Sequence, residues 1–373
     1  MEQLLEWIEI IEDIRQQRKV RYNIKEILII VLFATLANAD TWEEIADFAA
    51  WNKDYLKQYI ELKNGTPSHD TIQRVMGMIR PENLQQLQLR WQELLNSNEG
   101  EKLKKIICVD GKTMRGNKRK NGSACHIVSA WSREDGYCLG QKAVTEKSNE
   151  ITAIPQVLEA IEIKGQIVTI DAMGTQKAIA ETIRKRHGDY VLAVKGNQAT
   201  LEEDIQLYLG DREVQKELEK QGRYRKTREK AHGQIEIREY YQTEEIKWLS
   251  QKKDWKGIKS IGMEKKTLQQ GGEERTEYRY YISSLGEDIE LFSRAVRGHW
   301  AVESMHWHLD VTFKEDANST VDKIAAQNQN IIRKWCLSML KLIEIRGQKM
   351  SLKRKRFNIS FAPGQFIDEL MKI

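Results

Sequence analysis

The sequence predicts an α+β fold, with a mixed βββαβαβ core, an inserted β-rich subdomain and an N-terminal all-helical domain. Residues 1–100 show only helical periodicity, and residues 106–194 alternate β-like and helical segments. A second group of β-like segments then precedes the last helices. The chain has 373 residues, 40% hydrophobic and 31% charged, which is typical of a globular protein of two or three domains.

Residues 1–100 are expected to form a helical domain. Thr41 and Glu44 have the spacing of a capping box, Pro81 opens a helix, and residues 65–70 form a turn before another helix. Short helices joined by tight turns fit a DNA-binding domain, and equally a scaffold or dimer element. The helical spacing covers residues 4–14, 24–36, 42–51, 70–79 and 84–95.

Residues 101–198 are expected to form the first part of a catalytic domain. Two apolar runs, 106–110 and 167–171, each end on an acid, Asp110 and Asp171. Ligands of such sheets gather at strand ends, so both carboxylates should face one crevice. The other expected elements are strands over 124–131, 137–144 and 190–194 and helices over 149–163 and 174–187.

Residues 199–290 interrupt this order. A charged helical stretch over 201–222 precedes β-like segments at 235–242, 258–267 and 278–283, with a Gly271-Gly272 turn. We interpret this stretch as an inserted β-rich subdomain, which separates Asp171 from the helices that follow.

Residues 291–345 are expected to complete the catalytic domain, with one continuous helix over 298–311 and another over 325–345. His299, Glu303, His306 and Asp310 are spaced i, i+4, i+7 and i+11, which places them on one helix face. Trp300, Trp307 and Val311 form an apolar stripe beside that face. The simpler interpretation is an amphipathic helix whose polar face meets water. A zinc site on this helix is set aside, because ligands at i and i+7 lie ~10 Å apart.

The charge is unevenly distributed. The net charge is only +5, but residues 102–120 carry +7 and residues 331–357 carry +8. Such clusters suggest a polyanionic partner, although a charged run is often only a solvated face. The C-terminal segment 346–373 is therefore expected to be a basic, DNA-binding segment.

Cysteine spacing and hydropathy indicate the cellular compartment. The four cysteines show no CxxC spacing, which favours a reduced, intracellular protein. The longest apolar run, residues 27–39, is shorter than the ~20 residues of a membrane span. We expect a soluble, cytoplasmic protein with no membrane partner.

An ordered series of short motifs resembles the H-repeat-associated DDE transposases of bacterial insertion sequences. The motifs span 65–71, 109–116, 126–131, 147–155, 169–176, 189–198 and 297–316. The resemblance implies an RNase H-like fold with a catalytic, metal-binding triad on Asp110, Asp171 and Glu303. It further implies Mg²⁺, with Mn²⁺ able to substitute, and double-stranded DNA (terminal inverted repeats and target) as the partner. We also expect a homodimer on paired element ends and association with the nucleoid. No small-molecule substrate is expected.

The chain departs from that family at a few positions. Ser304 stands where the family usually has Asn, and the interval from Glu303 to His306 is one residue shorter. His299 occupies the position of a basic residue in related transposases, and Lys314 is a loose match to their Lys.

Further residues are candidates for DNA contact, among them Lys314 and His299, which could orient Glu303 or a phosphate. Lys112 and Arg115 follow Asp110 and could bind phosphates, or only line a solvated loop. Lys195 and Asn197 end a strand at the same crevice. Trp300 could stack on a base, but core packing is the favoured interpretation. The chemistry predicted is phosphodiester hydrolysis and strand transfer by three carboxylates and two Mg²⁺ ions; the alternative is a catalytically silent, domesticated DNA-binding descendant.

Overall fold

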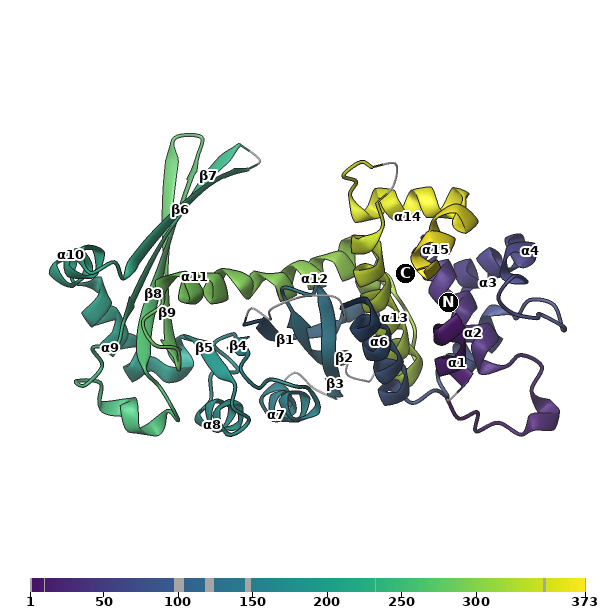
Figure 1. The fold of residues 1–373 in the computed structure, drawn as a ribbon, viewed down its shortest axis with the longest axis horizontal. Coiled ribbons are helices and arrows are strands. Elements are labelled where there is room, and N and C mark those ends of the chain that lie inside the picture. The colour runs from purple at the N-terminus through teal and green to yellow at the C-terminus, as the bar shows by residue number, and fades with distance from the viewer. Residues whose placement is uncertain are drawn as a thin grey trace.

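The computed structural model describes residues 2–9, 11–96, 104–117, 124–144, 149–231, 233–344 and 347–372. Part of the first basic cluster (Lys102, Lys118, Arg119 and Lys120), Arg346 and the start of the 147–155 motif lie outside these residues. The molecule is elongated, with the N-terminal helices at one end of the long axis and strands β6–β9 at the other (Figure 1).

The described residues up to Asn96 form helices and no strand, as predicted. The expected capping box at Thr41 and Glu44 is present at the start of α3. The first helix is shorter than predicted: the segment between α1 and α2 is polar, and only a 3-10 turn, η1 (Gln17–Lys19), forms there. The helices are α1 (Glu2–Glu9), α2 (Ile24–Leu36), α3 (Trp42–Trp51), α4 (Lys53–Leu56), α5 (His69–Met76) and α6 (Pro81–Asn96).

The predicted order of strands and helices in the core is confirmed. Strand β1 pairs with β2 in antiparallel and with β4 in parallel orientation, and β4 pairs with β5 in parallel. The spatial order is β3-β2-β1-β4-β5. The elements are β1 (Ile106–Met114), β2 (Cys125–Ser132), β3 (Tyr137–Val144), α7 (Glu150–Ala160), β4 (Ile167–Ile170), α8 (Lys177–Lys185) and β5 (Asp189–Val194).

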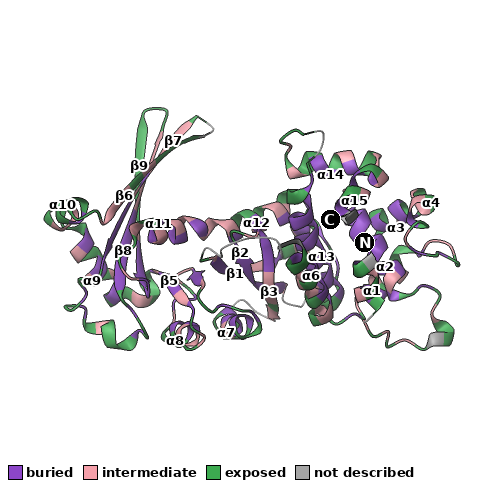
Figure 2. Ribbon diagram, in the orientation of Figure 1, coloured by how far each residue is buried: buried purple, intermediate pink, exposed green. Residues whose placement is uncertain are grey.

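The two faces of this sheet belong to two apolar cores. Side chains alternate along a strand, so Ile107 and Val109 of β1 pack into one core, with α7 and α8. Ile106 and Cys108 point to the opposite face and pack into the other core, with α11, α12, α13 and the N-terminal helices. Figure 2 shows the buried residues running through the sheet and through α13.

The strands of residues 199–290 extend the same sheet instead of forming a second one. Strand β9 pairs with β5 in antiparallel orientation, so the full order is β3-β2-β1-β4-β5-β9-β8-β7-β6. The expected helix over 201–222 is broken at Asp211, which caps a second helix. The elements are α9 (Ala199–Gly210), α10 (Arg212–Lys220), β6 (Tyr224–Ala231), β7 (Gln234–Thr243), β8 (Ser260–Gln270) and β9 (Glu273–Ser283).

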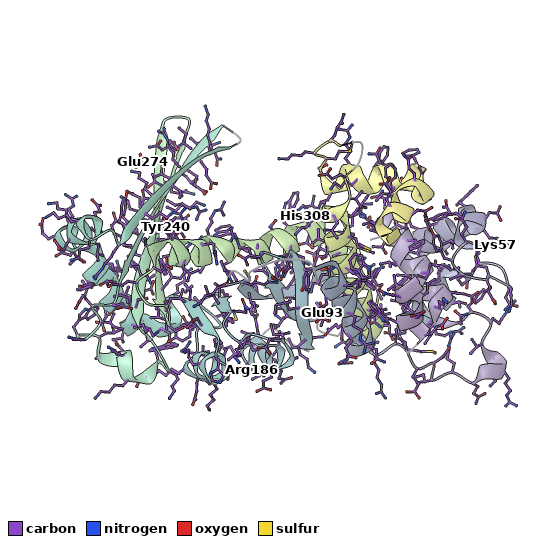
Figure 3. The ribbon with its side chains drawn as sticks, in the orientation of Figure 1. Lys57, Glu93, Arg186, Tyr240, Glu274 and His308 are labelled. Atoms are coloured by element: carbon purple, nitrogen blue, oxygen red, sulfur yellow. The ribbon has the colours of Figure 1, made fainter. Side chains whose placement is uncertain are left out.

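Two consecutive helices cross the sheet where one was predicted. α11 (Ile289–Gly298) ends at Gly298, α12 (Trp300–Val311) begins two residues later, and His299 between them keeps helical dihedral angles. The two helices therefore run almost as one rod from the β6–β9 strands to α13 (Figure 1). In Figure 3, Tyr240 of β7 lies beside one end of this rod and His308 marks the other.

The C-terminal part of the chain returns to the N-terminal helices. α13 (Lys323–Leu342) is buried along most of its length, packing on α2, α5 and α6 and also on β2 and β3. The helices α14 (Leu352–Phe361) and α15 (Pro363–Lys372) then pack on α2. Among the described residues, no helix combines the length and the apolar character needed to cross a bilayer.

The C-terminal basic cluster is partly internal, which corrects the expectation that it is a DNA-binding segment throughout. Arg333 and Lys334 of α13 and Lys355 and Arg356 of α14 are buried. Arg356 donates hydrogen bonds to backbone carbonyls of the N-terminal helical region and to Asp40. These cations hold the helices together and are not available to a polyanion.

Candidate active site

Asp110 and Asp171 occupy equivalent positions on two adjacent strands. The parallel ladder between β1 and β4 ends at the pair Val109–Ile170, so each carboxylate is the next residue along. The side chains of Asp110 and Asp171 fall on the face of Ile106 and Cys108, which α12 covers. The predicted convergence of the two acids on one side of the sheet is therefore present.

Asp110 is not at the end of its strand, as was expected. The antiparallel partner β2 continues to pair with β1 through Met114, so Asp110 lies in mid-strand opposite Ser129. Only the pairing with β4 stops before Asp110. The opening beside the acid comes from the shorter neighbour β4.

Backbone amides hold both carboxylates. Asp110 Oδ1 accepts from the Gly111 N–H at 2.8 Å, and Asp171 Oδ1 accepts from the Gly174 N–H at 3.1 Å. Backbone hydrogen bonds of this kind stabilise the ionised form of a carboxylate and fix its direction.

The two acids have pKa values displaced in opposite directions. Burial raises the pKa of Asp171 above its usual value, and the charge of Asp110 adds to this, against the Gly174 hydrogen bond. Burial also acts on Asp110, but the hydrogen bond and charge of His306 outweigh it and hold the pKa of Asp110 below its usual value. Neighbouring carboxylates with divergent pKa values are typical of functional sites.

Helix α12 carries the third acid, Glu303, and the histidine that contacts Asp110, His306. His306 Nδ1 lies 3.4 Å from Asp110 Oδ2, and Asp310 Oδ1 lies 2.8 Å from Lys112 Nζ. Two members of the predicted helix face therefore point at β1. Glu303 is exposed on the helix and borders a cavity. The predicted apolar stripe is not buried, because Trp307 and Val311 are about half exposed.

The close approach of the helix to the sheet depends on Gly298. A Cβ at this position would lie 2.8 Å from Arg133 Cδ and 3.1 Å from Ile106 Cδ1, so a larger residue would push the helix away from β1. The Gly298 carbonyl also accepts from Cys108 Sγ at 3.2 Å. The end of α11 thus lies against β1 at Gly298, just before His299 and α12.

His299, at the helix junction, is held beside the acids in its neutral form. Its Nδ1 lies 3.1 Å from Thr169 Oγ1. Burial lowers the pKa of His299, although the charges of Asp110, Asp171 and Glu303 oppose the shift. All three acids are thus near enough to His299 to influence its charge.

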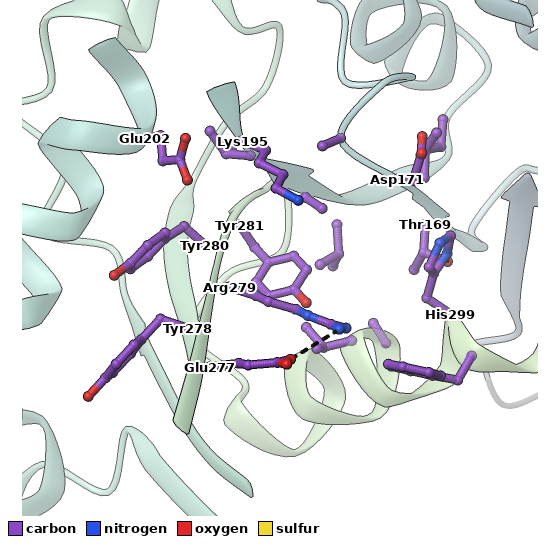
Figure 4. A pocket seen from close by; sticks show the side chains of 18 of the residues that line it. Thr169, Asp171, Lys195, Glu202, Glu277, Tyr278, Arg279, Tyr280, Tyr281 and His299 are labelled. Carbon is purple, nitrogen blue, oxygen red and sulfur yellow. Dashed lines mark hydrogen bonds and ion pairs between the residues drawn. The ribbon is translucent and has the colours of Figure 1, made fainter. Parts of the chain in front are cut away.

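A cavity of about 670 Å³ opens beside Asp171, Glu303 and His299. Its opposite wall is strand β9, with Arg279 and Tyr281, and Lys195 at the end of β5 (Figure 4). Asp110 is not among the residues that line this cavity. The wall opposite Asp171 and Glu303 thus mixes cations and tyrosines with two further acids, Glu202 and Glu277, and Glu277 lies 3.9 Å from Arg279 (Figure 4).

Trp300 lies at the border of the cavity under three cations. The charged groups of Arg238, Lys266 and Arg279, from β7, β8 and β9, lie 5.6, 5.3 and 5.0 Å from the ring centroid. Cation–π contacts of this kind stabilise a half-buried indole. Trp300 therefore joins α12 to the inserted strands. This contact was not among the two predicted roles, which were stacking on a base and packing in the core.

Lys112 has a structural environment that the sequence did not suggest. Its ammonium lies 2.8, 3.3 and 3.1 Å from carboxylates of Asp310, Glu315 and Asp316, and the side chain is only 10% exposed. This corrects the expectation of a phosphate contact, because the charge is already neutralised. Arg115, in contrast, is 83% exposed, with its Nε 3.7 Å from Asp316 Oδ2.

The other candidate residues are dispersed around the site. Lys195 is exposed and lines the cavity. Asn197 donates to the Ala172 carbonyl at 2.5 Å and so ties the loop after β5 to the loop after Asp171. Lys314 has a left-handed backbone (φ 48°) and pairs with Asp40 at 3.3 Å, away from the cavity lining.

A buried polar chain behind Asp110 was missed by the sequence analysis. His126 Nε2 lies 3.0 Å from Glu150 Oε2, and His126 Nδ1 lies 2.9 Å from Thr113 Oγ1. Gly111 packs against this pair. Both His126 and Glu150 stand in the motifs noted above, and that was the only signal for them.

The donor set suits a hard divalent cation. Carboxylate oxygens are the ligands that Mg²⁺ prefers, and Asp110, Asp171 and Glu303 all lie near enough to act electrostatically on His299. In the described ranges, however, no group of three or more His, Cys, Asp or Glu side chains is gathered closely enough to coordinate one ion. The residue types fit the metal, and Asp110 Oδ2 is instead engaged by His306.

A mixed sheet with acids on adjacent strands and on a covering helix defines the class of DDE-type proteins, and sequence comparison identifies the family. Residues 101–339 match the family model described as "Transposase DDE domain", and residues 5–92 match the one described as "DDE_Tnp_1-associated". The chain belongs to the transposase DDE domain family.

Individual relatives agree with the resemblance predicted from the motifs. "Putative transposase YncI" of Escherichia coli O157:H7 is 38% identical over 368 residues, covering 96% of this chain and 92% of that protein. "H repeat-associated putative transposase YhhI" of Escherichia coli (strain K12) is 38% identical over 324 residues, covering 85% and 84%. The predicted family is therefore confirmed.

Solved structures were also matched. One of them is a cryo-EM structure of a piggyBac transposase synaptic complex with hairpin DNA, with a TM-score of 0.40 at 10% identity. The match covers 99% of this chain and 78% of that chain.

Proposed function

We propose that this protein is a DNA transposase that hydrolyses phosphodiester bonds at the ends of an insertion sequence and joins the freed strands to a target. The observation that carries the proposal is the equivalence of Asp110 and Asp171, one residue past the last pair of the same parallel ladder, under the helix that bears Glu303. The catalytic core proposed is RNase H-like and comprises residues 101–198 and 291–345. Residues 199–290 are its insertion.

Asp110, Asp171 and Glu303 are proposed to hold two Mg²⁺ ions, with Mn²⁺ able to substitute. Bound there, the metals would activate the attacking oxygen and stabilise the leaving oxygen of the phosphodiester. The protein contributes the carboxylate ligands, and the His306 contact holds the pKa of Asp110 below its usual value. The neutral His299 adds no positive charge among these ligands.

The cavity beside the acids is proposed as the site of the scissile strand. Lys195 places a cation on its far wall, where it can contact phosphates, and Arg279, which lies 3.9 Å from Glu277, adds a second. Trp300 supports that wall through its contact with Arg279. Arg115 and Lys314 are proposed to contact the flanking duplex, since both side chains are mostly exposed.

The test is cleavage of a duplex that carries the terminal repeats of the flanking element, with Mg²⁺. We expect the wild type to nick at the repeat end and Asp171→Ala to bind the same duplex without nicking it. Asp204→Ala is the matched control, because Asp204 is an acid of α9 that does not line the cavity. The control should cut like the wild type.

The alternative is a catalytically silent, domesticated DNA-binding protein. It predicts specific binding of the terminal repeats without cleavage in wild type and variant alike. That outcome would replace the proposed activity by DNA binding alone.

Two further proposals concern the assembly and its location. Two element ends require two active sites, so we propose a homodimer on paired ends, acting on DNA in the cytoplasm. Light scattering of the paired-end complex checks this point, and a monomer on that DNA would contradict it.

A further inference from the structure

A second cavity, of about 730 Å³, lies in the N-terminal helical region. It is formed by the segment between α1 and α2 and by the turn that leads into α5. The N-terminal helices occupy the end of the long axis opposite the β6–β9 strands that wall the first cavity (Figure 1). The second cavity is therefore separate from the carboxylate site.

Four cations and no acid line this cavity, which we call the basic cavity. Its charged lining residues are Arg15, Lys19, Arg21 and Arg74. Arg15 is neutralised by Asp13, with the two side chains 2.5 Å apart. The other three are exposed, and no ion pair is formed by them within the described ranges.

The walls of the basic cavity are held in place by hydrogen bonds between its two segments. The hydroxyl of Tyr22 donates to the carbonyls of Asn64 at 3.0 Å and Thr66 at 3.1 Å. Asn64 Nδ2 in turn donates to the Arg21 carbonyl at 2.7 Å. Arg15 donates to the Tyr22 carbonyl at 2.9 Å. The three unpaired cations therefore project from a fixed frame.

Neutral donors complement the cations. The hydroxyls of Thr66, Ser68 and Thr71 line the cavity, and Ser68 caps the first turn of α5. Asp70, in that same turn, lies 3.4 Å from His69 and does not line the cavity. Hydroxyls and a helix N-terminus beside unpaired cations are typical donors to phosphate oxygens.

The lining excludes a nucleoside as the principal ligand. Tyr22 supplies the only aromatic ring of the described lining; it is 9% exposed, and its hydroxyl is committed to the frame. A base would find no stacking surface, which single-strand and nucleotide sites require. The chemistry selects phosphate groups and not bases.

We propose that the basic cavity binds the phosphodiester backbone of double-stranded DNA and anchors the duplex at a distance from the active site. The inference rests on the proposed function, which makes DNA the substrate. Because phosphate contacts carry no base information, the cavity adds affinity and position without adding sequence specificity.

The test is the salt dependence of duplex binding, measured in the Asp171→Ala background without metal so that no cleavage occurs. The triple variant Lys19→Ala/Arg21→Ala/Arg74→Ala removes the three unpaired cations. Each phosphate contact contributes about 0.9 to the slope of log K against log salt. We expect the slope to fall by about 2–3 for three lost contacts, equally on terminal-repeat and unrelated duplexes.

The matched control removes three exposed cations from the opposite end of the molecule. Lys220→Ala/Lys252→Ala/Lys253→Ala changes the net charge by the same amount, and its slope should stay at the wild-type value. Arg74→Lys should also keep the slope. An unchanged thermal unfolding midpoint shows that the first triple variant is folded.

Each remaining outcome overturns a defined part of the proposal. An equal fall in the control, or none in the first triple variant, overturns the basic cavity as a DNA site. A fall confined to single-stranded DNA, or inorganic phosphate that binds the cavity without competing with duplex, overturns the duplex as ligand. If the triple variant shows the expected change in slope but the wild type never cleaves the duplex with Mg²⁺, only the proposed enzymatic activity is overturned.

Discussion

Replacing Arg356 by alanine should destabilise the protein through the contact between its two chain ends. The guanidinium is fully buried and donates to the carbonyls of Thr35, Ala39 and Thr312. It also lies 2.7 Å from the carboxylate of Asp40. In Arg356→Ala these acceptors lose their donor, and the buried Asp40 keeps only its pairing with Lys314.

The expected magnitude follows from the burial of this pair. Removing one partner of a buried ion pair costs about 3–5 kcal/mol, because the other charge is left uncompensated. An unfolding entropy of about 2.1 cal/mol/K per residue gives ~0.8 kcal/mol/K for 373 residues. The unfolding midpoint should therefore fall by about 4–6 °C.

The assay is thermal unfolding of wild type, Arg356→Ala and Arg354→Ala. Arg354 lies two residues earlier in the same basic run but is exposed. Its loss should change stability by less than about 0.5 kcal/mol. Equal unfolding midpoints for the two variants would refute the internal role of Arg356. They would indicate that Arg356 is a solvent-exposed cation like Arg354.

Three other substitutions test the site. Glu303→Gln should abolish cleavage and leave the unfolding midpoint within about 1 °C of the wild type, because the side chain is exposed; a large shift would mean a structural role. His306→Ala should raise the pKa of Asp110, so that the acid limb of the pH–rate profile moves to higher pH; an unmoved limb would contradict the His306–Asp110 contact. Gly111→Ala should destabilise the protein by about 1–3 kcal/mol in denaturant unfolding, since its Cβ would lie 2.7 Å from Glu150 Oε2; an unchanged stability would contradict that packing.

The order of strands and helices along the chain, and the placement of Asp110 and Asp171 on one side of the sheet, could be predicted because their signals are local. An apolar run followed by an acid specifies a buried strand and a polar residue at its end, and β4 with Asp171 follows that rule. The rule failed for Asp110 because strand length depends on the partner: β2 continues to pair through Met114. Side-chain alternation nevertheless placed Asp110 on the face of Cys108.

The remaining differences come from contacts between distant parts of the chain. Strand β6 is rich in charged residues and lacks a β-like pattern, so only its pairing with β7 makes it a strand. The burial of Arg356 depends on carbonyls more than three hundred residues away. Lys112 looked like a phosphate ligand because its three acidic partners lie about two hundred residues further along.

The pairing of β9 with β5 has a consequence for any shortened version of this protein. With residues 199–288 deleted, β5 would become the border of the sheet and its backbone donors and acceptors would meet solvent. The segment Asp189–Val194 is mostly apolar and buried, which is the composition of a self-associating edge. The deletion product should therefore sediment as aggregates, whereas removal of the β8–β9 turn residues Gly271 and Gly272 alone should leave a dispersed protein.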